Sequence, residues 1–177
     1  LTHYEFRFIS KSGEQRNIYL SIDMIPWTKK SIASLRDITT WKQSQTALLE
    51  KEERFRELFS RMPSGVAIYR AVDDGEDFVF TDFNPAAEAI EHIPKEEVIG
   101  RRVTDVFPGV KNFGIFSVFQ KVCKTGTPEF FPAAIYRNSH DPGSWRENWV
   151  FRLPSGEVVA IYHDITDRKK AEETLKE

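Results

Sequence analysis

The residue types that most often carry chemistry are few in this sequence and lie far apart. The chain has one cysteine, Cys123, and four histidines whose spacing does not match that of metal ligands. It has no glycine-rich nucleotide loop, no nucleophile elbow and no carboxylate pair spaced for acid–base catalysis. The sequence therefore predicts no catalytic residue and no metal site within its 177 residues.

Aromatic side chains offer a different chemistry, because an apolar wall with a few polar groups is what a small-molecule pocket requires. In "WRENWVFRL" (145–153), alternation places every second residue, including Trp149 and Phe151, on one side of a strand. The residues predicted to line a pocket are Phe83, Phe116, Phe119, Tyr136, Trp149 and Phe151. A filled core explains the same residues, and that interpretation is favoured because aromatic stripes are usually core.

The N-terminal part of the chain has the period of a sheet. Tyr4, Phe6 and Phe8 share one face of residues 3–11, and apolar residues again fall two apart in the next segment. We therefore predict a three-stranded antiparallel meander over residues 1–40. A segment this short cannot bury a core alone, so we expect another chain or the neighbouring helix to cover its apolar face.

Residues 41–62 change to a helical period. Trp41, Leu48, Phe55 and Met62 are seven residues apart, and no Gly or Pro interrupts the pattern before Pro63. The pattern predicts a connecting helix whose narrow heptad seam suits pairing with a second copy of the chain. An amphipathic helix lying on its own domain explains the same pattern, and both interpretations stay open.

Residues 63–166 have the element order of an α+β domain, with two strands, several short helices, a longer helix and three more strands. Asn84 and Pro85 form a strong start for the first of the helices. The predicted strands are 65–72, 78–83, 128–137, 145–153 and 157–166. This order predicts an antiparallel sheet with helices on one face. Residues 167–177 then form the start of an exit helix.

The tripeptide Asp-Ile-Thr occurs twice, at residues 37–39 and 164–166, each time between a strand and a charged helix. We predict that Ile anchors the strand, that Thr166 or Asp167 caps the helix, and that Asp164 pairs with a basic residue such as Arg168. An ordinary capped helix start would explain one copy. Two copies favour signal-transmission joints, formed by Asp37, Thr39, Asp164 and Thr166.

Taken in order, "FTDFNPAAEAI", "PKEEVIGRRVTDVFP" and the final "DIT" before a charged helix resemble a PAS domain, the sensory fold of bacterial and archaeal signalling proteins. Residues 63–166 resemble one complete domain, and residues 1–40 resemble the last three strands of a preceding one. The resemblance implies a five-stranded antiparallel sheet that encloses a small pocket together with the helices. It also implies that the flanking helices pass a change of state to a kinase, a cyclase or another output domain.

The resemblance narrows the choice of cofactor. An adduct-forming flavin sensor of this fold would carry an Asn-Cys-Arg-Phe-type motif, whereas Cys123 lies in "KVCKTG". A haem sensor would need an axial ligand such as histidine in the pocket, and only His163 on the last strand is placed where it could point inward. We therefore expect neither cofactor, and the ligand stays unknown.

Composition limits the partners and the location. A formal net charge of −2 argues against a nucleic-acid partner, and the apolar runs are far shorter than the roughly 20 residues that span a bilayer. The chain starts in a strand without an initiator Met, so we expect a cytoplasmic fragment of a longer protein. A membrane anchor of that protein would lie outside this sequence.

These observations predict a non-catalytic sensory or regulatory PAS module in a multidomain signal-transduction protein, with a histidine kinase as the expected output domain. The expected partners are a small-molecule ligand, a second copy of the chain in a homodimer, and the output domain. The alternative is a ligand-free spacer or protein-interaction module in a kinase or a cyclic-dinucleotide enzyme.

Overall fold

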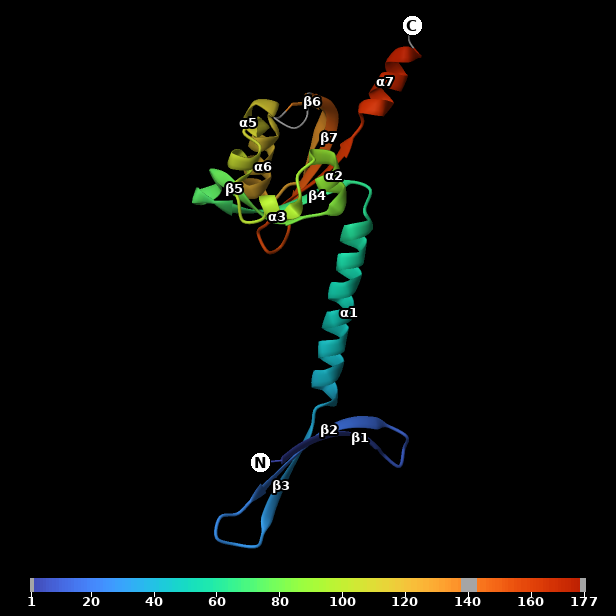
Figure 1. The fold of residues 1–177 in the computed structure, drawn as a ribbon, viewed down its shortest axis with the longest axis vertical. Helices are drawn as coiled ribbons and strands as arrows, with labels where there is room; N and C mark the ends of the chain where they lie inside the picture. The colour runs from blue at the N-terminus through green and yellow to red at the C-terminus, as the bar shows by residue number, and fades with distance from the viewer. Residues whose placement is uncertain (1, 138–142, 176–177) are drawn as a thin grey trace. The chain divides into compact units, whose positions relative to one another are not determined.

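A computed structural model describes residues 2–137 and 143–175 of the chain (Figure 1). The chain divides into two compact units, Leu1–Arg56 and Glu57–Glu177. Each unit is built on its own antiparallel sheet. The α+β class that the sequence predicts is confirmed, with a five-stranded sheet and a separate three-stranded one.

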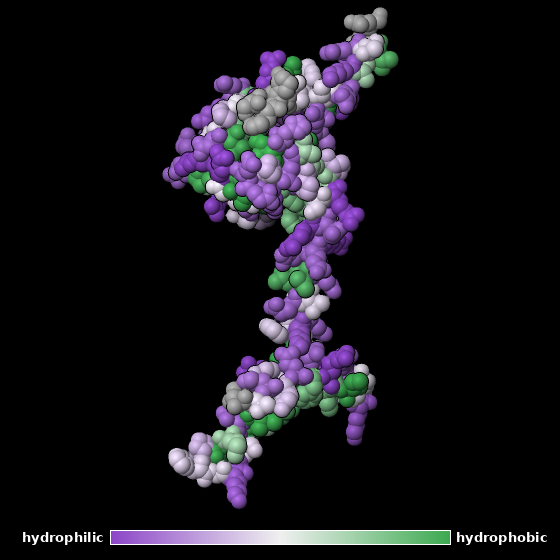
Figure 2. Space-filling view, in the orientation of Figure 1, coloured by the Kyte–Doolittle hydropathy of each residue, from purple (hydrophilic) through white to green (hydrophobic). Residues whose placement is uncertain are grey.

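The first unit holds the three-stranded sheet, in the order β1-β2-β3. Its strands are β1 (Thr2–Ile9), β2 (Gln15–Met24) and β3 (Ser31–Asp37). Every side chain of β1 and β3 is exposed, and Figure 2 shows apolar residues at the surface of this unit. The predicted meander is confirmed, and the apolar side chains of β1 and β3 are exposed while those in the middle of β2 are partly buried.

Helix α1 (Thr39–Arg61) follows β3 after Ile38. Its sequence contains no Gly or Pro, and Pro63 disfavours helical backbone at the residue before it. Ion pairs at i,i+4 spacing join Arg56 to Glu52 and Arg61 to Glu57 along its surface. The predicted connecting helix is confirmed, starting two residues earlier and ending one residue earlier than expected.

The second unit contains the five-stranded antiparallel sheet, in the order β5-β4-β8-β7-β6. The strands are β4 (Gly65–Val72), β5 (Asp77–Phe83), β6 (Glu129–Tyr136), β7 (Ser144–Arg152) and β8 (Val158–Asp164). The helices are the 3-10 turn η1 (Asp73–Gly75), α2 (Pro85–Glu91), α3 (Lys95–Val98), α4 (Val103–Val106), α5 (Val110–Phe113), α6 (Ile115–Thr125) and α7 (Thr166–Thr174).

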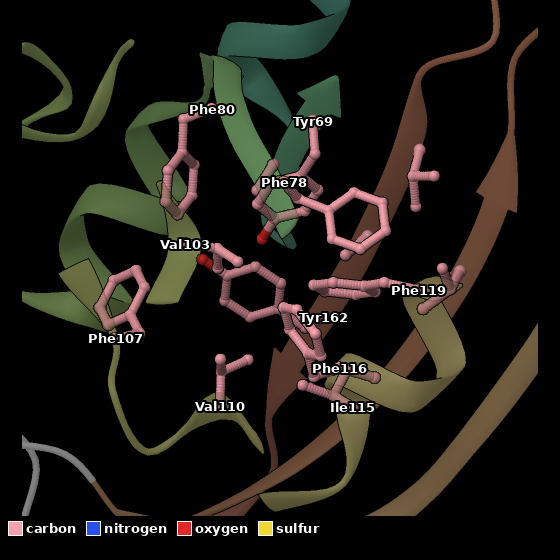
Figure 3. Packing of buried hydrophobic residues seen from close by; sticks show 14 of the residues in the cluster. Tyr69, Phe78, Phe80, Val103, Phe107, Val110, Ile115, Phe116, Phe119 and Tyr162 are labelled. Carbon is pink, nitrogen blue, oxygen red and sulfur yellow. The ribbon is translucent and has the colours of Figure 1, made fainter. Parts of the chain in front are cut away.

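The two faces of this sheet are covered differently. One face packs with helices α2 to α6 into the main core, which contains buried residues such as Tyr69, Phe78 and Phe119 (Figure 3). The other face forms a smaller cluster in which Phe59, near the end of α1, packs on Val66 and Val159. Both faces of the sheet therefore bury apolar side chains. For this reason, the alternation of residues along a strand does not by itself show which of them point into the main core.

Asn84 fixes the start of this unit. Its Oδ1 accepts hydrogen bonds from the backbone N–H of Val66 at 2.8 Å and of Ala87 at 2.9 Å, so it caps α2 as the sequence predicts. Its Nδ2 donates to the backbone oxygens of Phe59 and Ser64 at 3.1 and 3.0 Å. This fully buried side chain thereby joins the end of α1, the start of β4 and the start of α2.

Candidate functional site

A pocket of about 50 Å³ lies in the core of the second unit, between the sheet and the helices that cover it. A single water molecule needs about 10–15 Å³ of such space, so the pocket holds roughly four water-sized groups. The lining residues are Tyr69, Phe83, Glu91, Val103, Phe107, Val110, Phe113, Ile115, Phe119, Tyr136, Arg146, Asn148, Ala160 and Tyr162. The wall is mainly aromatic and aliphatic, with a few polar groups.

A buried ion pair forms part of this wall. The Arg146 guanidinium donates to Glu91 Oε1 at 3.0 Å, and the two side chains are only 3% and 9% exposed. The same guanidinium donates to Ser144 Oγ at 2.7 Å and to the backbone oxygen of Ile90 at 3.2 Å. Because buried charges are costly unless they are paired and hydrogen-bonded, these contacts are what allow both ions to stay inside the domain.

Asn148 is the second polar group of the wall. It lies on β7 opposite Tyr162 of β8, and its side chain is buried, with 6% of the residue exposed. Its amide nitrogen Nδ2 makes no hydrogen bond to any residue that the structure describes. Leaving a buried amide unpaired costs about 1–3 kcal/mol, so this donor is available to a molecule in the pocket.

Two tyrosines complete the polar lining. Figure 3 shows Tyr69 and Tyr162 directed into the middle of the core cluster. Burial raises the pKa of both phenols, and the negative charge of Glu91 raises them further, so each hydroxyl keeps its proton at neutral pH. Gly65 makes room for the ring of Tyr162, since a Cβ at that position would lie 2.5 Å from the ring.

The residues predicted to line a pocket separate into two groups. Phe83, Phe119 and Tyr136 line it, and Phe116 belongs to the same core cluster without lining the pocket. The prediction is wrong for Trp149 and Phe151. Trp149 is 53% exposed and contacts Phe130, while Phe151 packs in the cluster on the other face of the sheet.

The error is a choice of the wrong face of β7. Residues Arg146, Asn148 and Val150 point into the domain, whereas the residues between them point away. Because the side-chain period of a strand is two, choosing the wrong face misplaces every side chain at once. Sequence reasoning therefore missed Arg146 and Asn148, and it also missed Glu91 at the end of α2. The available signal was the polar pair Arg146 and Asn148 spaced two apart in a strand flanked by aromatic residues.

The two Asp-Ile-Thr joints make the same set of hydrogen bonds. In the first, Thr39 N–H donates to Asp37 Oδ1 at 2.9 Å, and Thr39 Oγ accepts from the backbone N–H of Asn17 at 2.8 Å. In the second, Thr166 N–H donates to Asp164 Oδ1 at 2.9 Å, and Thr166 Oγ accepts from the backbone N–H of Trp145 at 2.9 Å.

Two details of the predicted joints are wrong. The Thr hydroxyl bonds to the neighbouring strand rather than capping the helix, since it lies within reach of an N–H that ends the sheet ladder. Arg168 pairs with Glu147 at 3.1 Å, not with Asp164, because Glu147 lies on the outward face of β7 beside the helix. The predicted anchoring of the second joint is confirmed: Ile165 is buried.

Along α1, the predicted seam residues differ in exposure. Trp41, Leu48 and Phe55 are 59%, 62% and 54% exposed, as a surface for a second helix requires. Met62 lies one residue beyond the helix and packs against the cluster around Phe59. The seam therefore ends before Met62, which belongs to the second unit's own packing.

Residues considered as cofactor ligands lie away from the pocket. His163 shares a hydrogen bond of 2.6 Å with Ser64 and is not part of the pocket wall. Cys123 packs against the core on α6. Over residues 2–137 and 143–175, no group of three or more His, Cys, Asp or Glu side chains is arranged to hold a metal ion. Nor does any helix in these ranges have the length and apolarity needed to cross a membrane.

Comparison with known proteins identifies the fold around this pocket. Residues 59–170 match the family model described as "PAS fold". A domain of a sensory box sensor histidine kinase/response regulator from Geobacter sulfurreducens is similar to this chain, with a TM-score of 0.52 and 20% identity over 66% of this chain and 96% of that one. The PAS domain of an HTR-like protein from Haloarcula marismortui gives a TM-score of 0.50 and 20% identity over 70% of this chain and 99% of that one.

The PAS domain of Bordetella pertussis BvgS is similar as well, with a TM-score of 0.50 and 15% identity over 72% of this chain and 95% of that one. No curated protein matches the sequence. The family model covers well over half of the chain, and the solved structures named above are similar to it in fold. This chain belongs to the PAS family.

Proposed function

We propose that the second unit senses a small molecule in its core pocket and passes the bound state to an output domain through α1 and α7. The observation that carries the proposal is the polar lining of the pocket. A core that served only for stability would gain nothing from the unpaired buried amide of Asn148, which lowers the stability of the folded state. The unpaired amide therefore costs folding stability, and binding of a ligand in the pocket explains why the domain carries it.

The path from the pocket to the exit helix runs along β7. Asn148 lines the pocket, and Trp145, three residues earlier on the same strand, holds the second joint. Trp145 donates its N–H to Thr166 Oγ, and its backbone oxygen accepts from Ile165 N–H at 2.8 Å. A ligand that displaces β7 therefore displaces the first residues of α7.

Xenon under pressure tests this coupling, because it fills apolar pockets without requiring a specific polar partner. We expect xenon to change the amide hydrogen exchange of α7, measured residue by residue by NMR. Ala160→Leu, which fills the pocket, is expected to abolish the xenon effect. Ala67→Leu, in the same core but not in the pocket wall, is the matched control. Xenon binding with unchanged exchange in α7 would contradict a sensory function.

For the output domain we propose a histidine kinase in the same chain. The similar domain from Geobacter sulfurreducens comes from a sensor histidine kinase/response regulator, which supports this assignment. The first three strands support a tandem arrangement, because β3 leads into α1 through the same bonds by which β8 leads into α7. We therefore propose that residues 1–40 are the last strands of a preceding PAS domain.

A second candidate function is assembly of a homodimer through α1, favoured by the exposed seam residues Trp41, Leu48 and Phe55. Glutamate at Leu48 or Phe55 would place charge in such a seam, so L48E and F55E are expected to sediment as monomers. Lys51→Glu, at an exposed position of the same helix, is the control for added negative charge. Unchanged association of L48E and F55E would refute the dimer.

A further inference from the structure

The polar groups of the pocket also specify what kind of molecule it takes. The donor that has no partner in the described chain, Asn148 Nδ2, needs an acceptor atom, which a ligand in the pocket can supply. The hydroxyls of Tyr69 and Tyr162 lie in the same pocket, and the structure gives neither a hydrogen-bond partner among the residues it describes. Three donors therefore surround one small space.

The charge of the pocket argues against an ionic ligand. Arg146 is already paired with Glu91, so an added anion would be a buried charge without a counterion of its own. A cation would also lack a counterion, because the Glu91 carboxylate is already paired with Arg146, whose guanidinium carbon lies 5.8 and 5.9 Å from the ring centres of Tyr136 and Tyr162. The aromatic faces that would attract a cation are thus already next to one.

The size of the pocket and the apolar part of its wall determine the size of the ligand and the nature of its other end. A space of about 50 Å³ admits roughly four non-hydrogen atoms without rearrangement of the domain. Phe83, Phe107 and Phe119 supply apolar contact elsewhere in the wall. A small molecule with one polar end and a short apolar end matches this distribution.

We infer that the pocket binds a small uncharged molecule with a hydrogen-bond-accepting oxygen, such as a short ketone, aldehyde, amide or alcohol, and that Asn148 is the residue that recognises the oxygen. This inference rests on the proposed sensory function and specifies its ligand class. In the complex, Asn148 Nδ2 and the tyrosine hydroxyls donate to the ligand oxygen. The apolar end lies against the phenylalanine rings.

Four planar probes, each with four non-hydrogen atoms, test the assignment by NMR titration of the full chain. They are acetone, acetate, guanidinium and 2-methylpropene. Acetone is expected to bind in the millimolar range, at least tenfold more tightly than either ion, because each ion would lack a counterion in the pocket. It is expected to bind about fivefold more tightly than 2-methylpropene, which has the same shape without the oxygen.

Asn148→Leu separates recognition from folding. The leucine keeps the approximate volume and removes the unpaired amide, so the variant is expected to unfold at the same temperature as the wild type or a higher one. Its preference for acetone over 2-methylpropene is expected to fall to less than twofold. Glu147→Gln, on the opposite face of β7, is the control and is expected to bind both probes as the wild type does.

The outcomes separate this inference from the proposed function. Tighter binding of acetate or guanidinium than of acetone would overturn the uncharged class, and wild-type preference in Asn148→Leu would overturn the role of Asn148. Binding of xenon without binding of acetone would also overturn the inference, with water as the partner of Asn148, while leaving a pocket that can act as a sensor. Acetone binding with unchanged exchange in α7 would support the ligand class and contradict the sensory function.

Discussion

The two strand-to-helix joints of this chain make the same local bonds in different surroundings. In each, the Thr N–H donates to the Asp carboxylate two residues earlier, and the Thr hydroxyl accepts a backbone N–H from the neighbouring strand. The Ile between them donates to a backbone oxygen of the same neighbour, Asn17 in the first joint and Trp145 in the second. The tripeptide therefore determines the local geometry in both places.

The surroundings differ in packing and in charge. Ile165 of the second joint is buried, whereas Ile38 of the first is only partly so. Arg16 forms a 2.8 Å ion pair with Asp37 in the first joint, and the corresponding position in β7 is Ser144, which bonds to Arg146 instead. The first joint is thus strengthened by a surface charge and the second by a packed domain. We therefore expect a substitution to have a larger effect at the second joint, which is supported by packing, than at the first, which is supported by a surface ion pair.

The largest expected effect comes from removing the support of the second joint alone. Asn84→Ala abolishes four hydrogen bonds and leaves their buried backbone partners unpaired, so we expect a loss of about 3 kcal/mol in the free energy of unfolding of the second unit. Hydrogen exchange should then speed up at Thr166 but not at Thr39. Asn112→Ala, at an exposed position of α5, is the control and should change stability by less than about 0.5 kcal/mol. Equal acceleration of hydrogen exchange at Thr166 and Thr39 would show that both joints depend on the packing of the second unit.

A smaller effect is expected when the same bond is removed from each joint. Thr166→Val leaves the partly buried N–H of Trp145 without its acceptor, which should cost about 1–2 kcal/mol in chemical denaturation of the second unit. In Thr39→Val the N–H of Asn17, which is also partly buried, loses its acceptor, but the first joint has only the partly buried Ile38 beside it. Local exchange at Asn17 should therefore change by the smaller factor. Thr127→Val, at an exposed position, is the control. A larger effect at Thr39 than at Thr166 would contradict the comparison.

Sequence reasoning succeeded where one short segment determines its own structure. The positions of the joints, the meander, α1 and the Asn84 cap were predicted from spacing within a few residues, because these features are local or follow from strand order. The bond from each Thr hydroxyl to the neighbouring strand was not predicted, because its partner lies more than 20 residues away. The seam of apolar residues spaced seven apart on α1 was also predicted from the sequence, although its last member, Met62, packs within the second unit.

The pocket was predicted less well because its residues are selected by tertiary structure. The outward face of β7 carries Trp149 and Phe151, and the inward face carries Arg146 and Asn148, so hydrophobicity pointed to the wrong face. On the outward face, Phe151 packs in the cluster that contains Phe59 and Met62, whereas Trp149 stays exposed. The partner that makes Arg146 tolerable inside is Glu91, 55 residues earlier, and no local pattern connects the two.

The smallest expected effect concerns the charge that distinguishes the first joint. Hydrogen bonds from the hydroxyl and N–H of Thr39, and then from Arg16, lower the pKa of Asp37 to about 2. Because this value lies below that of the unfolded chain, near 3.9, the carboxylate stabilises the joint above pH ~4, and the contribution is lost as the pH falls from about 4 to about 2.

Arg16→Ala should raise the pKa of Asp37 only part of the way to its ordinary value, since the bonds from Thr39 remain. Carboxyl-detected NMR titration measures this shift, with Arg7→Ala on β1 as the control for a lost positive charge in the same sheet. An Asp37 that titrates at its ordinary value in the wild type would show that the hydrogen bonds do not persist in solution. An unchanged Asp37 in Arg16→Ala would show that the ion pair adds nothing, and the two joints would then differ in packing alone.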